Sequence, residues 1–153
     1  MSMINKMPGS YEDKFANLKA GYTFMTGHPG KKLLFMGQDF GQLHEWDEKK
    51  ALDWYLAEEP LHENLQRYVR SLLTLYRKYP CLSRLDSDPE GFQWINANDG
   101  DRSIFSFIRR DENKKEKSAL YHQFYPCSQG ALPGRRPQAG QFHPGAGQRT
   151  RLL

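Results

Sequence analysis

The chain has 153 residues, of which 38% are apolar, so it is long enough to bury a core of ordinary size. Its net charge of +4 comes from its end, because the first 116 residues hold all 18 acidic residues and 17 cations, whereas the last 37 hold five cations and no acid. Five scattered cations argue against a nucleic-acid partner, and two distant cysteines, Cys81 and Cys127, indicate neither a zinc site nor a disulfide framework.

The first predicted element is a helix that follows a loop over residues 1–9. Ser10, with Asp13 three residues later, gives the spacing of a capping box at its start. Apolar residues then recur at helical spacing, namely Phe15, Leu18, Tyr22 and Met25. Gly27, followed by Pro29, predicts the end of this helix.

A short strand and a polar loop come next. The apolar run Leu33–Met36 has the length of a strand buried on both faces, and Gly37 ends it. The residues after it are rich in amides, carboxylates and tryptophans: Gln38, Asp39, Gln42, His44, Glu45, Trp46, Asp47, Asp53 and Trp54. Because ligands bind at the carboxyl ends of parallel strands, this loop predicts a polyhydroxylated substrate.

A second helix gives the strongest periodic signal in the chain. Pro60 is well placed at its start and Pro80 ends it. Its apolar stripe consists of Leu65, Tyr68, Val69, Leu72, Leu73 and Tyr76. The basic residues off this stripe are expected to be solvated: Arg67, Arg70, Arg77 and Lys78.

The pattern then changes from helical to β. Residues 92–97 and 103–108 are short strand-like runs, joined by the turn signal Asn98–Asp101. Residues 88–91 mark a plausible boundary between an α/β part and an all-β part. From Lys117 onward Gly, Pro, Gln and Arg dominate and no apolar period remains, which predicts disorder.

Several stretches together resemble the 1,4-α-glucan (glycogen) branching enzymes of glycoside hydrolase family 13. The matching stretches are Ser2–Ile4, Lys6–Gly9, Lys14–Leu18, His28–Gly37, Glu45–Trp46, Leu52–Trp54 and Gly91–Ile95. The resemblance covers residues 2–116. The family often has Glu where this chain has Asp39, a difference between two carboxylates.

The resemblance implies an α/β fold, namely the incomplete C-terminal portion of a (β/α)8 barrel followed by the first strands of an all-β C-terminal domain. Residues 1–87 would be the barrel portion, residues 88–116 the start of the β-sandwich, and residues 117–153 a frameshifted, disordered tail. One buried strand with two helices would leave sheet edges open. We therefore expect poor solubility or a molten, self-associating state.

The resemblance also implies a function. Branching enzymes are transferases of glycogen biosynthesis that cleave an α-1,4 link by a retaining mechanism and transfer the glucan to a 6-hydroxyl. The family's three catalytic carboxylates precede the point where this chain begins, so we expect no catalytic residue and an inactive fragment. The expected partners are an α-glucan and the missing N-terminal part of the parent enzyme. No cofactor or metal is expected, and His28, His44 and His62 lack metal-ligand spacing.

Five loop residues are expected to bind substrate, namely Gln38, Asp39, Glu45, Trp46 and Trp54. Gln38 directly follows the strand end, and tryptophan rings suit the apolar faces of sugars. Trp46 either stacks on glucose or packs the loop, and for Trp54 packing is the favoured interpretation. Asp39 and Glu45 could instead form a general acid/base pair, or merely bind hydroxyls and cap the backbone.

The composition of the tail suggests a shifted reading frame. A one-base insertion near Lys117 would explain the tail, because a neighbouring frame can encode a strand resembling the family's next one.

The chain could instead be a self-standing α-glucan-binding module, or a small basic scaffold that binds anionic partners through its tail. No signal peptide or membrane-spanning run is found, so we expect a cytoplasmic protein with no membrane partner.

Overall fold

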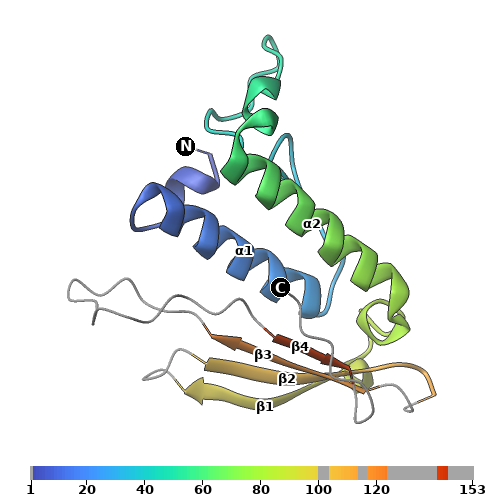
Figure 1. Ribbon diagram of the computed structural model, residues 1–153. Helices are drawn as coiled ribbons and strands as arrows, with labels where there is room; N and C mark the ends of the chain where they lie inside the picture. The colour runs from blue at the N-terminus through green and yellow to red at the C-terminus, as the bar shows by residue number, and fades with distance from the viewer. Residues whose placement is uncertain (1, 100–103, 114–116, 124–140, 145–153) are drawn as a thin grey trace.

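The computed structural model describes residues 2–99, 104–113, 117–123 and 141–144, the last two stretches by their backbone. Two long helices lie side by side over one end of an antiparallel sheet, so the molecule is mixed α/β (Figure 1). The elements in chain order are η1 (Ile4–Lys6), α1 (Tyr11–Gly27), η2 (Trp54–Glu58), α2 (Pro60–Lys78), η3 (Pro80–Leu82), η4 (Pro89–Gly91), β1 (Phe92–Asp99), β2 (Ile104–Arg110), β3 (Lys117–Gln123) and β4 (Gln141–Pro144).

Helix α1 begins and ends where the sequence predicts. The Ser10 hydroxyl accepts a hydrogen bond from the Asp13 amide, and the Ser10 amide donates to the Asp13 carboxylate, so both halves of the capping box form. Phe15, Leu18 and Tyr22 are all buried on one face of the helix. The helix ends at Gly27, as its sequence predicts.

Helix α2 packs its apolar stripe against that face. Pro60 occupies the first turn, where its missing N–H costs nothing, and the helix ends two residues before Pro80. One cluster of buried side chains joins the two helices to η1: Ile4, Phe15, Leu18, Tyr22, Leu65, Val69 and Leu72. The four predicted basic residues lie exposed on the outside of α2, as expected.

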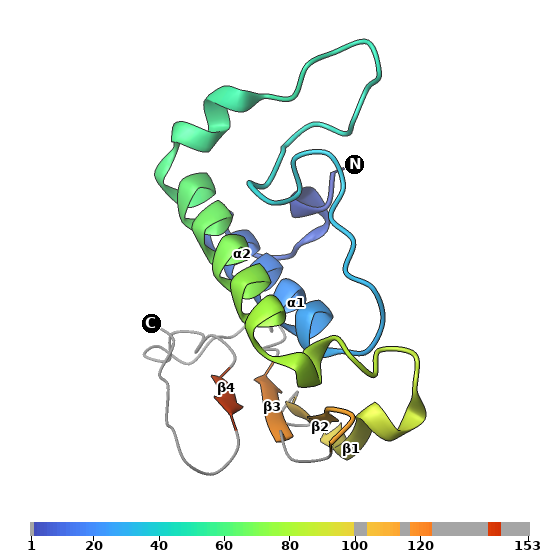
Figure 2. The same cartoon turned by 90° about the vertical axis from the view of Figure 1, so that its right-hand side faces the viewer.

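The predicted strand Leu33–Met36 is wrong for this chain. Residues 33–35 pair with no described strand, and Met36 already lies in a turn with a φ of 30°. Figure 2 shows their segment stretched out by itself, running back along the helix pair. Leu34 is half-buried against the helix core, whereas Leu33 is 74% exposed. A strand buried on both faces needs paired strands beside it and packed elements over both faces. The described residues supply no paired strand here and cover only the side of Leu34.

The sheet has the strand order β1-β2-β3-β4, with antiparallel pairing throughout. The predicted hairpin is confirmed as β1 and β2, although residues 100–103 between them lie outside the described residues. Phe92 and Trp94 share one face of β1, as predicted, and both rings contact Phe107 of β2. Most of the predicted disordered tail lies outside the described residues, apart from the backbone of β3 and β4.

A second core joins the sheet to the helices. It contains Cys81, Leu82 and Phe107, with Phe24 packed against them. Beside it, the fully buried Arg109 donates to the carboxylate of Asp86 at 2.6 Å and to the carbonyl of Gly27 at 3.0 Å. A residue of β2 thereby holds the C-terminal end of α1.

Candidate functional site

The polar loop begins with two glycines that permit its tight turns. Gly37 and Gly41 have φ values of 78° and 77°, a region that side-chain-bearing residues rarely adopt. A Cβ at Gly37 would lie 2.9 Å from the Cβ of Gln42, so a larger residue would force the turn open. The Gln42 amide donates to the Gly37 carbonyl at 3.0 Å and closes this turn.

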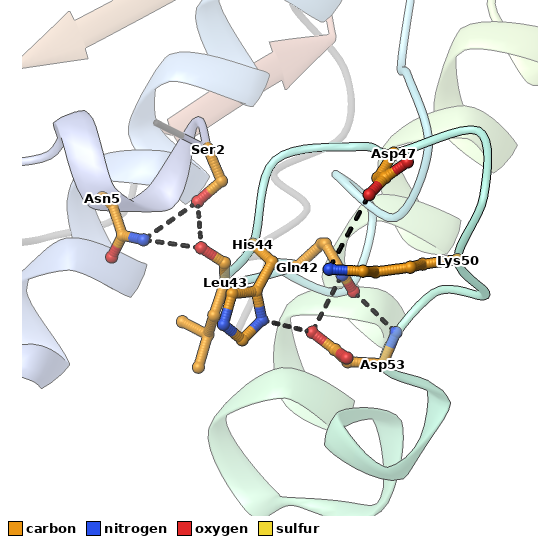
Figure 3. Close-up of polar contacts among 8 residues, drawn as sticks. All are labelled: Ser2, Asn5, Gln42, Leu43, His44, Asp47, Lys50 and Asp53. Carbon is orange, nitrogen blue, oxygen red and sulfur yellow. Dashed lines mark hydrogen bonds and ion pairs between the residues drawn. The ribbon is translucent and has the colours of Figure 1, made fainter.

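A hydrogen-bonded bridge closes the base of the loop (Figure 3). The side-chain amide of Gln42 donates to the Asp53 carboxylate at 2.9 Å, and the Asp53 backbone amide donates to the Gln42 side-chain oxygen at 3.0 Å. The His44 ring nitrogen Nδ1 lies 2.7 Å from the same carboxylate. These polar groups therefore hold the loop together.

The segment around η1 anchors the loop from the other side. The Leu43 carbonyl accepts hydrogen bonds from the Ser2 hydroxyl at 2.8 Å and from the Asn5 side-chain amide at 2.7 Å (Figure 3). Farther along, Lys50 and Asp47 form an exposed ion pair at 3.7 Å. The loop is thus held near both of its ends, while residues 44–46 are exposed between the anchors.

A cavity of about 250 Å³ lies between this loop, η1 and α1. Three of the five predicted site residues line it, namely Gln38, Glu45 and Trp46. Its other walls include Ser2, Ile4, Lys6, Leu18, Tyr22, Phe35, Gln42 and His44. The cavity therefore combines an exposed indole, a carboxylate, amides and an ammonium group around an apolar floor, the mixture that small polar ligands need.

Trp46 and Gln38 are held by the extended segment that precedes the loop. The Trp46 ring meets the Phe35 ring edge-to-face with centroids 5.6 Å apart, yet 44% of Trp46 stays exposed. The Gln38 side-chain oxygen accepts from the Phe35 amide at 3.1 Å. Trp46 is therefore oriented by packing on one side and remains accessible on the other.

Asp39 and Trp54 lie elsewhere. Asp39 lines a separate groove beside α2, where its carboxylate accepts from the Gln66 side chain at 3.2 Å. Trp54 is 60% exposed and packs on the ring of Phe40 at a centroid distance of 5.4 Å. Since Asp39 and Glu45 line different cavities, these two carboxylates do not face each other across one site.

The curated relatives of this chain are 1,4-alpha-glucan branching enzymes. The enzyme of Butyrivibrio fibrisolvens is 58% identical over 115 residues, which cover 75% of this chain and 18% of that protein. The enzyme of Nitrobacter hamburgensis is 46% identical over 141 residues, covering 92% and 20%. The enzyme of Aquifex aeolicus is 48% identical over 125 residues, covering 82% and 20%. No protein-family model matches the chain.

The chain corresponds to a segment of a 1,4-alpha-glucan branching enzyme. The resemblance inferred from the sequence is thereby confirmed. The segment spans about a fifth of the length of the curated relatives that it matches. The division of the chain into barrel, sandwich and frameshifted tail stays a prediction.

Sequence reasoning missed two residues of the branching-enzyme segment that shape the cavity. Tyr22 reads as a core residue of α1, but its hydroxyl donates to the Gln38 carbonyl at 2.8 Å and fixes the start of the loop. Burial, reinforced by the charge of Asp39, raises the pKa of Tyr22, so this phenol stays protonated as a donor. Lys6 also lines the cavity. Both residues come from elements remote in sequence, so no local pattern reveals them.

A missed buried histidine connects the segment's two helices. His62 of α2 lies 2.6 Å from the Phe40 carbonyl and 2.7 Å from the Tyr11 hydroxyl. Within the described part of the chain, no group of three or more His, Cys, Asp or Glu side chains is placed to hold a metal ion. None of the described helices has both the length and the apolar character needed to cross a bilayer.

Proposed function

We propose that this segment contributes part of the glucan-binding surface of a 1,4-alpha-glucan branching enzyme and does not branch glucan by itself. The proposal is supported mainly by one observation: the anchored loop places Trp46, Gln38 and Glu45 in the lining of a single cavity. An indole face suits the apolar face of a glucose ring, and amide and carboxylate groups suit its hydroxyls. The names of the relatives supply the substrate class.

In the same proposal, the helix pair and the extended segment form the C-terminal portion of a (β/α)8 barrel, and β1 and β2 begin the all-β domain. Ligand sites in such barrels lie at the carboxyl ends of the strands. The cavity loop directly follows the apolar residues Leu33–Met36, which fits that position. The parent enzyme would cleave an α-1,4 link and transfer the glucan to a 6-hydroxyl, using carboxylates supplied by another part of the parent enzyme.

Binding of maltoheptaose to the purified chain tests the glucan surface. We expect Trp46→Ala to weaken binding about tenfold in titration calorimetry, equivalent to about 1.4 kcal/mol. The matched control is Trp94→Ala, because Trp94 has a similar exposure, 40% against 44%, and lies on the sheet away from the cavity. Unchanged binding by Trp46→Ala, or an equal loss in Trp94→Ala, would contradict the proposal.

Catalysis is tested separately by following the iodine staining of amylose. We expect no branching by the chain alone, since the family resemblance implies that the catalytic carboxylates belong to another part of the parent enzyme. Activity that survives controls for a contaminating host enzyme would show that the chain assembles its own acid/base pair. Glu45, the carboxylate that lines the cavity, would then be the first residue to substitute.

A further inference from the structure

Lys32 lies between the C-terminal end of α1 and helix α2, and its terminal nitrogen is held from several sides. The nitrogen donates hydrogen bonds to the carbonyl of His28 and, at 2.7 Å, to the carbonyl of Gly30. It also lies over the ring of Tyr76, 5.2 Å from the centroid. A neutral amine has two N–H groups, so it can keep both hydrogen bonds and still present its lone pair.

A second cavity, of about 230 Å³, adjoins Lys32. Its wall is mainly apolar and includes Met25 of α1 and Leu73 of α2. The hydroxyls in this wall are already used within the chain, since Thr26 donates to the Tyr22 carbonyl at 2.7 Å and the Tyr22 hydroxyl bonds to the polar loop. Among the described wall residues, only Lys32 is charged at neutral pH. A molecule in this cavity therefore meets apolar surface and one reactive nitrogen.

The nitrogen of Lys32 also loses its proton more easily than that of an ordinary lysine. Burial lowers the pKa of Lys32 from 10.5 to about 8. The negative charge of Asp86 opposes this shift, and the positive charges of Arg109 and Lys31 add to it. At pH 8 about half of Lys32 is then the free amine, against about 0.4% of a lysine with the reference pKa. Since only the free amine is nucleophilic, Lys32 gains reactivity near neutral pH.

We propose that Lys32 is a site of Nε-acylation, which takes a short apolar acyl group, such as butyryl, from an acyl phosphate and places it in the adjoining cavity. The amine nitrogen forms a bond to the acyl carbon, and the bond between that carbon and the phosphate oxygen breaks. Inorganic phosphate leaves with the electron pair, and the proton of the nitrogen passes to water. The product is a neutral amide, so no charge has to be held in the partly buried site. This reaction is independent of glucan binding.

Labelling of the whole chain with acetyl phosphate and butyryl phosphate tests the site, and tandem mass spectrometry measures the rate at each lysine. The neighbouring Lys31, which is exposed, is the internal control. We expect Lys32 to react at least about tenfold faster than Lys31 at pH 8, and its rate to level off above that pH, where the amine is free. Equal rates at the two lysines, or a Lys32 rate that keeps rising to about pH 10, would overturn the proposal.

Two substitutions in α2 test whether the cavity receives the acyl group. Leu73→Trp enlarges a partly exposed residue of the cavity wall, whereas Thr74→Trp changes an exposed residue that lines the neighbouring groove and not this cavity. In the unsubstituted chain we expect butyryl to be favoured over acetyl at Lys32, relative to Lys31, by at least about threefold.

Leu73→Trp should abolish this preference and leave acetylation of Lys32 unchanged, which also shows that the variant is folded. Thr74→Trp should keep the preference. A preference for acetyl at Lys32, or a butyryl preference that survives Leu73→Trp, would contradict the proposal.

Discussion

At the scale of single residues, Arg109 of the sheet forms buried hydrogen bonds to the helical part of the chain. Its guanidinium is fully buried and binds Asp86, the Gly27 carbonyl and the Leu82 carbonyl. The Asp86 carboxylate also accepts from the Tyr76 hydroxyl at 2.7 Å. Burial alone would raise the pKa of Asp86, but the hydrogen bonds from Arg109 and Tyr76 and the nearby positive charges outweigh it and lower that pKa.

Asp86→Ala should therefore destabilise the fold strongly. Removing one partner leaves a buried, unpaired charge, and we expect a loss of about 3–5 kcal/mol in the free energy of unfolding. Chemical denaturation measures it. The double variant Asp86→Ala/Arg109→Met should regain part of the loss, because no orphaned charge remains. An exposed pair supplies the control, since Glu63→Ala, which removes the 3.8 Å contact to Arg67, should cost less than about 1 kcal/mol.

The pH dependence gives a second measurement of the same pair. Because the pKa of Asp86 is lower in the folded state, its contribution is present above the ordinary carboxyl pKa, near 3.8, and is lost as the pH falls through the folded value. The difference in stability between the wild-type chain and Asp86→Ala should therefore shrink in acid below that point. A difference that stays constant down to the acid unfolding limit would show that Asp86 acts only through packing.

At the scale of elements, the helices follow local signals and the extended segment does not. The bounds of α1 and α2 follow from a capping box, two prolines and a periodic apolar stripe, all readable in the sequence. Leu33–Met36 is equally apolar, yet it stays outside the described sheet. A helix satisfies its hydrogen bonds within itself, and the two strands of the β1–β2 hairpin are each other's neighbours, so both can be predicted from local sequence. A strand whose partners lie elsewhere cannot be predicted in this way.

The cap of α1 provides a test at this scale. Ser10→Ala removes the acceptor for the Asp13 amide and should lower the free energy of unfolding by about 1 kcal/mol. The matched control is Ser71→Ala, since the Ser71 hydroxyl donates to the Arg67 carbonyl within α2 and alanine favours a helix interior. Thermal unfolding of both variants gives the comparison. Equal effects would mean that the capping box contributes nothing of its own.

At the scale of the whole molecule, two small cores stabilise the described fold. One joins α1, α2 and η1, and the other joins β2 to η3 and the end of α1. Around them, several large apolar side chains remain exposed, including Leu33, Trp54 and Tyr55. A chain with this surface is a poor candidate for a well-behaved monomer, which agrees with the self-association expected from its sequence.

Sedimentation velocity tests that expectation. We expect the chain to self-associate as its concentration rises, because Leu33, Phe35 and Met36 expose apolar surface. Among the described residues, the backbone groups of Leu33 and Leu34 also make no backbone hydrogen bond. Leu33→Lys should reduce the association, and Tyr55→Lys should reduce it less. A single monomeric species at every concentration, with a cooperative thermal transition, would contradict the prediction.

The sequence by itself determined the two helices, the hairpin, the loop rich in amides, carboxylates and tryptophans, and the branching-enzyme relationship. Those features depend on local periodicity, caps and matching stretches. Only the tertiary structure decided that Gln38, Glu45 and Trp46 share a cavity while Asp39 faces another, and that Gln42 and Asp53 bind each other. Such groupings depend on how distant elements pack, because side chains from η1, α1 and the loop meet only after the helices bury their common core.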